Sequence, residues 1–189
     1  ASRIHSITVF LEKSIGKLGF KQVNKQYFDT LRFILPDSVS AQQIRTIALS
    51  KEVNLRYFDN GDVGISVDET TTQADATLIL NLFAVAAEEP MHDVCAIPGK
   101  APVAAQFQRL STYLTHEVFQ KYHTETEMMR YIKRLERKDI SLAHSMISLG
   151  SCTMKLNAAS EMLPLSNAAW MNLHPLVPED QAAGYQALI

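Results

Sequence analysis

The first 88 residues alternate between helical and strand spacing of their apolar side chains. Apolar residues recur at helical spacing from Ile4 to Leu18, and Gly19 follows at the position where helices commonly end. From Tyr27 to Leu35 the apolar side chains take alternate positions instead, and Pro36 ends the run. The alternating positions are Tyr27, Leu31, Phe33 and Leu35. The pattern predicts a helix followed by a strand with one buried face.

A hairpin is predicted between residues 54 and 67. The dipeptide Asn60-Gly61 separates two short β-rich runs, residues 54–59 and 62–67. Such a dipeptide is typical of a type I′ turn, which needs a positive φ at both positions. A two-residue turn would place Phe58 opposite Val63.

Two further helices are predicted on either side of this hairpin. Residues 40–43 and 70–73 both fit a helix-capping box. The apolar stripes that follow are Ile44, Ile47 and Ala48 in the first helix, and Leu78, Leu82, Val85 and Ala86 in the second. The resulting order α-β-α-β-β-α predicts an α+β fold, with a small mixed or antiparallel sheet and helices on one face.

The remaining chain divides into a connection and a helical extension. Residues 89–115 are punctuated by proline and glycine, and we interpret them as a long ordered connection with one short helix. Residues 116–189 open with a strong helix, because Thr124 to Glu127 forms a capping box and basic residues cluster near its end. Its packing face is Met128, Ile132, Leu135 and Leu142. A further helix is predicted near Gln181.

Composition narrows the class of protein. The chain is 47% hydrophobic and 20% charged, with a net charge of -2, as in ordinary globular proteins and unlike nucleic-acid binders. No apolar run approaches the ~20 residues of a membrane span. Two cysteines, Cys95 and Cys152, are too few for a disulfide framework, and they form no CxxC pair for zinc. A reduced, cytosolic-type setting is the default. The chain opens without an initiator methionine and runs straight into helical periodicity, and residues 184–189 read as a cut through a helix, so we expect both ends to be artificial.

Metal binding is not expected from the acidic residues near position 125. His123, Glu125 and Glu127 lie within five positions, with His144 further on. Capping and the helix dipole already account for both carboxylates. We interpret the charge cluster from residue 130 to 138 as a solvated or interdomain helix face, and Cys95 as a buried small residue.

Residues 150–157, Gly-Ser-Cys-Thr-Met-Lys-Leu-Asn, are the richest in reactive groups. A catalytic serine or cysteine beside a lysine general base is one reading. Ser151 lies four residues before Lys155, not the three of the SxxK motif, whereas Cys152 does lie three residues before it. The other reading is a polar loop packed under a neighbouring domain.

The same segment carries a family resemblance, together with stretches that precede and follow it. These stretches are Tyr27–Thr30, Asp68–Thr72, Tyr122–Tyr131, Leu135–Asp139, Leu149–Asn157, His174-Pro175 and Gln181–Tyr185. In this order they resemble the P-protein of the glycine cleavage system over nearly the whole chain. Ser148 departs from the family, which usually has proline there, and we expect this difference to loosen the entry to the loop slightly.

The resemblance implies part of an enzyme dependent on pyridoxal 5′-phosphate (PLP). P-proteins bind PLP as a Schiff base to a lysine, decarboxylate glycine, and pass the aminomethyl group to the lipoyl arm of H-protein. This chain resembles the small domain of the earlier fold-type-I half (residues 1–88), the connection (89–115), and the segment that opens the later half (116–189). The cofactor lysine is expected beyond Ile189, and Lys155 does not match its motif.

Several expectations follow from this resemblance. No catalytic residue and no bound PLP are expected in this chain, and Ser151, Cys152, Thr153, Lys155 and Asn157 are candidates for part of the active-site wall. The expected partners are H-protein and the remainder of P-protein, as a homodimer or an αβ pair. No nucleic-acid or membrane partner is expected. The compartment would be the cytoplasm in a bacterium or the mitochondrion in a eukaryote. Without its neighbours, the face of the helix near residue 128 should be buried against another copy or stay mobile.

Two other functions stay open at this point. One is a self-contained interaction module with a ferredoxin-like sheet. The other is a cysteine hydrolase that uses Cys152 and a histidine, for which there is no local signature.

Overall fold

The computed structural model describes residues 1–94, 96–97, 99, 101, 103–139, 144, 160 and 163–189. The chain forms two compact units, residues 1–108 (unit 1) and residues 109–189 (unit 2). Each unit is described by itself below.

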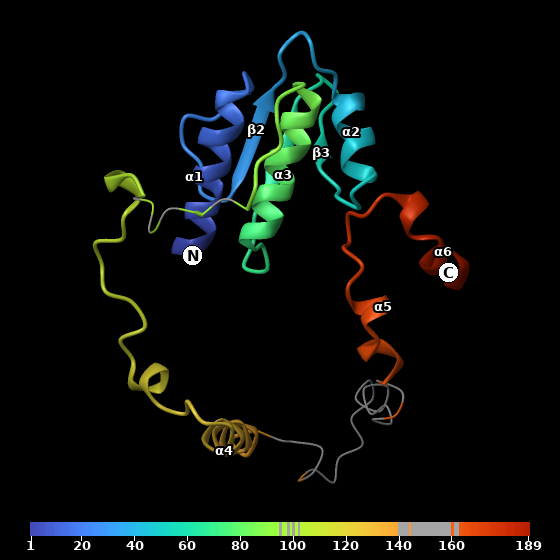
Figure 1. Cartoon of the computed structure of the whole chain (residues 1–189). Helices are drawn as coiled ribbons and strands as arrows, with labels where there is room; N and C mark the ends of the chain where they lie inside the picture. The colour runs from blue at the N-terminus through green and yellow to red at the C-terminus, as the bar shows by residue number, and fades with distance from the viewer. Residues whose placement is uncertain are drawn as a thin grey trace. The chain divides into compact units, whose positions relative to one another are not determined.

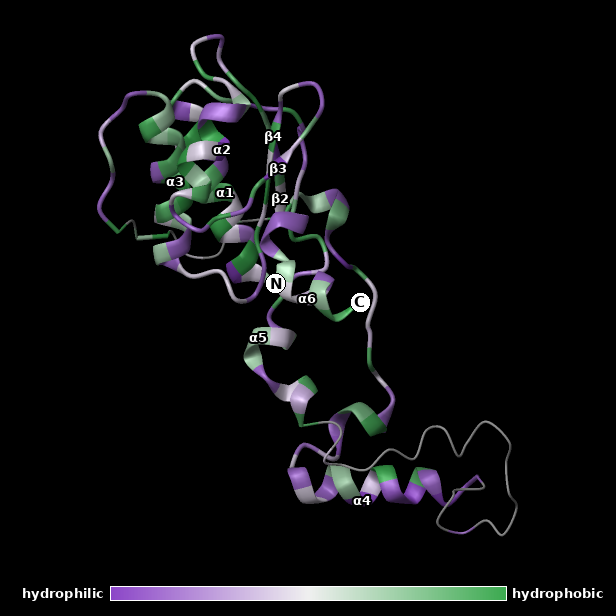
Figure 2. Cartoon of the chain, turned by 90° about the vertical axis from the view of Figure 1, so that its right-hand side faces the viewer, coloured by the Kyte–Doolittle hydropathy of each residue, from purple (hydrophilic) through white to green (hydrophobic). Residues whose placement is uncertain are grey.

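Unit 1 is a four-stranded antiparallel sheet with three helices on one face. Its elements are α1 (Ser2–Lys17), β1 (Lys21–Gln22), β2 (Thr30–Ile34), α2 (Ala41–Leu49), β3 (Arg56–Tyr57), β4 (Val63–Ser66), α3 (Gln73–Ala86) and the short 3-10 helix η1 (Ala105–Phe107). The strand order is β1-β2-β4-β3. Figures 1 and 2 show α1, α2 and α3 together on one side of the strands. The predicted α+β class is confirmed, and the short strand β1 is an addition to it.

The core of unit 1 lies between the sheet and these helices. The alternation predicted for β2 is confirmed at Leu31 and Phe33, which are fully buried. Phe83 of α3 contacts Phe20 edge-on, with ring centroids 5.0 Å apart, and lies 5.8 Å from the Phe33 ring. Other buried residues are Ile7, Leu11, Ile15, Ile44, Ala48, Val63, Ile65, Ala76, Leu80 and Leu82. The apolar stripe predicted for α3 is confirmed only in part, because Leu82 and Ala86 are buried but Val85 is 42% exposed, and the buried Leu80 and Phe83 were not predicted.

The predicted register of the β3–β4 hairpin is wrong by one residue. Tyr57, not Phe58, is opposite Val63. Gly61 has a φ of +89°, but Asn60 is not among the residues with positive φ. The Gly61 N–H donates to the Phe58 carbonyl at 2.9 Å, and the Phe58 N–H donates to the Asp62 carbonyl at 3.0 Å. The connection is thus a three-residue loop in which only glycine takes the left-handed conformation, rather than a type I′ turn.

The start of α3 also differs from the sequence expectation. Its N-cap is Thr72, whose hydroxyl accepts the N–H of Asp75, and the Asp75 carboxylate accepts the Thr72 N–H in return. The N–H groups of Thr70 and Thr71 instead donate to the Asp68 carboxylate, at 2.8 and 3.1 Å. Because these donors are already satisfied by a turn, the helix begins two residues later than predicted.

The two other predicted helix boundaries of unit 1 are confirmed. Gly19 follows α1 with a φ of +92°, a conformation that glycine adopts without steric cost. Ser40 caps α2, since its side chain accepts the N–H of Gln43 at 3.1 Å.

The sheet face away from the helices is polar. Arg32 of β2 donates from Nε to the Asp62 carboxylate at 2.7 Å, and its guanidinium lies 4.2 Å from the centre of the Phe58 ring. Phe58 in turn covers Gly64, where an added Cβ would lie 3.0 Å from the ring. An ion pair and a cation–π contact thus occupy this face of the sheet.

The start of the predicted connection lies along the helices of unit 1. The Asn81 side chain forms two hydrogen bonds with the backbone of His92, donating to its carbonyl at 3.0 Å and accepting its N–H at 2.7 Å. The Ser6 hydroxyl accepts the N–H of Ala101 at 2.9 Å and lies 3.0 Å from the Gly99 carbonyl oxygen. These contacts tie the segment after α3 back to α1 and α3.

Unit 2 is built of short helices, as the expected helical extension requires. Its described elements are η2 (Glu117–Gln120), α4 (Glu125–Glu136), η5 (Pro164–Ser166), α5 (Ala168–Met171), η6 (Glu179–Gln181) and α6 (Ala183–Leu188). In the tail, the Tyr185 hydroxyl donates to the Trp170 carbonyl at 2.8 Å, and the two rings meet edge-on. The capping box at Thr124 and Glu127 is confirmed. Across the described part of both units, no helix is long and apolar enough to cross a membrane.

Candidate functional site

The segment favoured as an active-site wall lies outside the described residues. The candidate wall residues outside the description are Ser151, Cys152, Thr153, Lys155 and Asn157. Cys95 and Leu142, for which burial or packing was predicted, also lie outside it. Their predicted roles stay predictions.

Of the two acidic residues at the start of α4, Glu127 takes part in a capping box. The Glu127 carboxylate accepts from the hydroxyl of Thr124 at 3.1 Å, while the Thr124 hydroxyl accepts the Glu127 N–H at 3.3 Å. Within the described ranges, no group of three His, Cys, Asp or Glu side chains is arranged to hold a metal ion.

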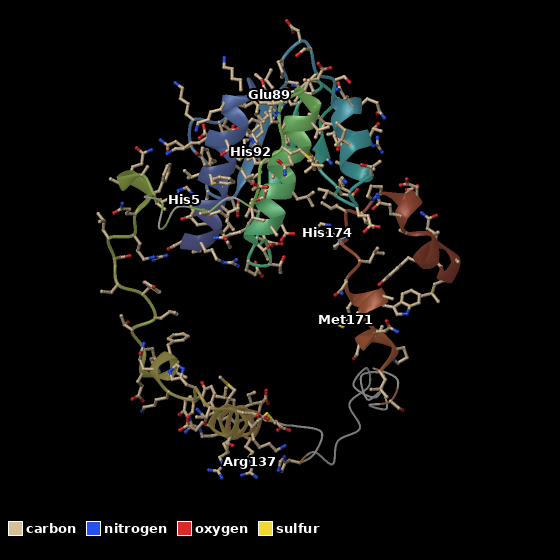
Figure 3. The ribbon with its side chains drawn as sticks, viewed as in Figure 1. His5, Glu89, His92, Arg137, Met171 and His174 are labelled. Carbon is tan, nitrogen blue, oxygen red and sulfur yellow. The ribbon has the colours of Figure 1, made fainter. Side chains whose placement is uncertain are left out.

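A cationic hollow in unit 2, which we name the Arg134 pocket, brings several charged and aromatic side chains together. Its volume is about 390 Å³. It is lined by His116, Glu117, Val118, Lys121, Tyr122, Tyr131, Arg134, Leu135 and Lys138. The first five come from η2 and the residues on either side of it, the next three from α4, and Lys138 from the turn that follows α4. Figure 3 shows the nitrogen-tipped side chains around α4, where Arg137 is labelled.

Two stacked tyrosines fix the guanidinium in this pocket. The rings of Tyr122 and Tyr131 are nearly parallel, with centroids 4.3 Å apart and an interplanar angle of 11°. The Arg134 guanidinium lies 5.4 and 5.2 Å from the two ring centres and donates to the Tyr122 hydroxyl at 2.6 Å. Each contact restricts the same side chain, so the cation is held in one place.

An ion pair lies at the edge of the Arg134 pocket. Lys121 donates to the Glu117 carboxylate at 2.7 Å. This hydrogen bond lowers the pKa of Glu117 and raises the pKa of Lys121. Both side chains are exposed, and such pairs contribute little to stability. Within the pocket, the Glu117 carboxylate neutralises the charge of Lys121.

The sequence prediction missed this pocket. Tyr122 and Tyr131 are nine positions apart and meet because the chain turns back before α4, with Tyr122 at a φ of +62°. Tyr131 and Arg134 are three positions apart on the helix, which places them on one face. The sequence could therefore have indicated that Tyr131 and Arg134 lie side by side. It could not have indicated that Tyr122 completes the cluster.

Comparison with known proteins assigns the family. Residues 1–83 match the family model described as glycine cleavage system P-protein. Over 189 residues the chain is 77% identical to the glycine dehydrogenase (decarboxylating) of Bacteroides fragilis and 68% identical to that of Bacteroides thetaiotaomicron. It is 41% identical to the mitochondrial glycine dehydrogenase (decarboxylating) of Mus musculus. Residues 1–83 thus carry the glycine cleavage system P-protein domain, and the whole chain matches part of these glycine dehydrogenases.

The chain spans about a fifth of the length of these P-protein relatives, namely 20% of the two bacterial proteins and 18% of the mouse protein. The P-protein family model ends within α3. The relatives nonetheless match the whole of this chain, so both units have counterparts in these glycine dehydrogenases. The family resemblance is thereby confirmed.

Proposed function

We propose that this chain is a non-catalytic part of a PLP-dependent glycine decarboxylase. In this proposal, residues 1–88 form the small domain of the earlier half, residues 89–115 connect the halves, and residues 116–189 open the later half. The observation that carries the proposal is 77% identity over all 189 residues to a glycine dehydrogenase of which the chain spans 20%. The core of unit 1 supports a scaffold role, because its described members all come from unit 1.

The described lysines do not fit the attachment of PLP. A lysine that forms a Schiff base is desolvated in an enclosed site, which lowers its pKa and makes it nucleophilic. Every lysine of the described ranges lies at an exposed position, namely Lys13, Lys17, Lys21, Lys25, Lys51, Lys121, Lys133 and Lys138. We therefore assign no catalytic step to them. In the whole enzyme, PLP would supply the electron sink for decarboxylation.

The candidate wall residues would face the anionic groups of the site. Hydroxyls, an amide and a cation suit the glycine carboxylate and the cofactor phosphate. Ser151, Thr153, Lys155 and Asn157 supply these within seven positions. Cys152 belongs to the same wall in this proposal. The competing role for this loop is to anchor the joint between the two halves.

The proposed partners follow from the whole enzyme. They are the remainder of P-protein, as a homodimer or αβ pair, and the lipoyl arm of H-protein, which would take the aminomethyl group. The relatives include bacterial and mitochondrial proteins. We accordingly propose the cytoplasm for a bacterial source and the mitochondrion for a eukaryotic one.

An exchange of segments tests this function. The matching residues of the Bacteroides fragilis enzyme would be replaced by this chain, and glycine decarboxylation measured with H-protein. We expect the chimera to assemble and to release CO2 from glycine. As a control, the same chimera with Phe33→Asp should fail to fold, because Phe33 is fully buried. A chimera that is inactive, whether folded or not, contradicts the proposal.

The same chimera separates the two roles of the candidate wall. Lys155→Met should abolish decarboxylation while leaving the melting temperature unchanged. Full activity, or activity lost only in step with folding, would place Lys155 in the joint instead.

A further inference from the structure

The Arg134 pocket has features that a merely solvated helix face does not require. Tyr122 is a bulky residue at a φ of +62°, a conformation that L side chains rarely adopt. Such strain persists only where the surrounding contacts enforce it, and it is concentrated at functional sites. Here the enforcing contacts are the stack on Tyr131 and the hydrogen bond from Arg134.

The pocket carries an excess of positive charge. Three cations line it, from Lys121, Arg134 and Lys138, against the single carboxylate of Glu117. The hydrogen bond to Tyr122 uses one of the five N–H donors of the Arg134 guanidinium, which lie in a planar fork. That fork matches the oxygens of carboxylates and phosphates.

His116 adds a neutral donor. Its Nδ1 accepts the N–H of Val118 at 3.1 Å. A neutral imidazole that accepts through Nδ1 carries its proton on Nε2. The ring therefore presents an N–H group rather than a lone pair from its other nitrogen.

We propose that the Arg134 pocket binds the phosphate group of a small phosphorylated ligand. Arg134 and Lys138 would compensate a doubly charged anion, since Lys121 is already paired with Glu117. The stacked tyrosines hold the guanidinium before binding, so little conformational entropy is lost when the anion enters. A volume of about 390 Å³ lies in the range of small-molecule sites. The inference depends on contacts within unit 2 and is independent of the function proposed above.

Amide NMR titration of the 189-residue chain with inorganic phosphate tests this assignment. Sodium chloride at matched ionic strength and sodium acetate serve as the other two titrants. We expect saturable shifts with phosphate at residues 116–122 and 131–138, and only small, unsaturable shifts with chloride. Acetate should bind at least about tenfold more weakly, because a single charge forms fewer charge-assisted hydrogen bonds.

Three substitutions make the test specific. Arg134→Met should raise the dissociation constant for phosphate at least about tenfold, since a charge-assisted hydrogen bond is lost. Lys138→Met should weaken binding while leaving the Tyr122–Arg134 contact intact, so it reports on charge even if Arg134→Met disturbs the stack. The matched control is Arg109→Met, which removes a guanidinium that lies 5.2 Å from the Tyr113 ring but lines no part of the pocket.

The outcomes that overturn the assignment are distinct. Equal chemical-shift changes with phosphate and chloride would show that the changes arise from ionic strength and not from phosphate binding. Equal affinity for acetate and phosphate would show that the pocket does not prefer a dianion. Unchanged phosphate affinity in both Arg134→Met and Lys138→Met would show that the pocket is not the binding site.

Discussion

The two units contain similar local signals and reach different degrees of packing. Both α3 and α4 begin with a capping box. In unit 1, α3 buries Leu80 and Phe83 against the sheet, whereas none of the described residues of unit 2 is buried. The apolar face predicted for α4 is exposed at Met128, Ile132 and Leu135, by 44%, 53% and 43%. Local pattern thus determines that a helix forms, but a core requires a second apolar face opposite it.

The largest expected effect is the loss of a core side chain from unit 1. Phe33→Ala should lower the free energy of unfolding by about 3–5 kcal/mol, because a buried aromatic ring is removed and a cavity is left. Ile132→Ala in α4 should change it by less than about 0.5 kcal/mol, as is usual for exposed positions. Urea unfolding followed by near-ultraviolet circular dichroism measures both. Comparable losses at the two positions would show that α4 shares the core of unit 1.

A smaller effect is expected from the helix caps. Thr72→Ala should destabilise unit 1 by about 1 kcal/mol, since the α3 N-terminus loses the acceptor for the Asp75 N–H. Thr124→Ala removes the same contact from α4, so it should reduce helix content without moving the unfolding midpoint of unit 1. Far-ultraviolet circular dichroism and the urea midpoint, measured together, distinguish the two. A shift of the unit 1 urea midpoint in Thr124→Ala would instead show that the unfolding of the two units is coupled.

The smallest effect is a loss of stability in acid. The pKa of Asp62 is lowered, first by the hydrogen bond from Asn60 and then by Arg32, and the pKa values of Asp68 and Asp75 are lowered by bonds from threonines. A carboxyl group with a lowered pKa stabilises the folded state above its unfolded pKa of about 4, and this contribution is lost as pH falls through the lowered value.

The melting temperature of unit 1 should therefore fall as pH decreases below about 4. Asp62→Asn should flatten this dependence, whereas Asp59→Asn, at an exposed loop position, should leave it unchanged. Thermal unfolding measured in steps of pH provides the comparison. A steeper decline in Asp62→Asn would mean that the sign of this argument is wrong.

Much of unit 1 could be predicted from the sequence because its periodicities are long. The helix from Ser2 to Lys17 and the strand from Thr30 to Ile34 each present several buried positions at regular spacing. Strand β1 has only two residues and no pattern of its own, and it exists because Lys21 and Gln22 pair with β2. The hairpin register depended on the φ of a single residue, Asn60, which dipeptide statistics do not fix.

The site could be predicted less fully than the fold. The residues 151–157 were selected by composition and family resemblance, which carry no geometry. The Arg134 pocket depends on a stack between Tyr122 and Tyr131, formed through a backbone conformation that propensity disfavours. Tertiary contacts of this kind override local preference, and they are therefore invisible in the pattern of apolar positions.

The most direct test of the central claim is covalent trapping of PLP by the 189-residue chain. PLP would be added, the imines reduced with borohydride, and the modified residues mapped by mass spectrometry. Because the described lysines are exposed, we predict scattered, substoichiometric modification and no specific adduct. A single stoichiometric adduct at Lys155 would contradict the claim that this chain is a non-catalytic part of the enzyme.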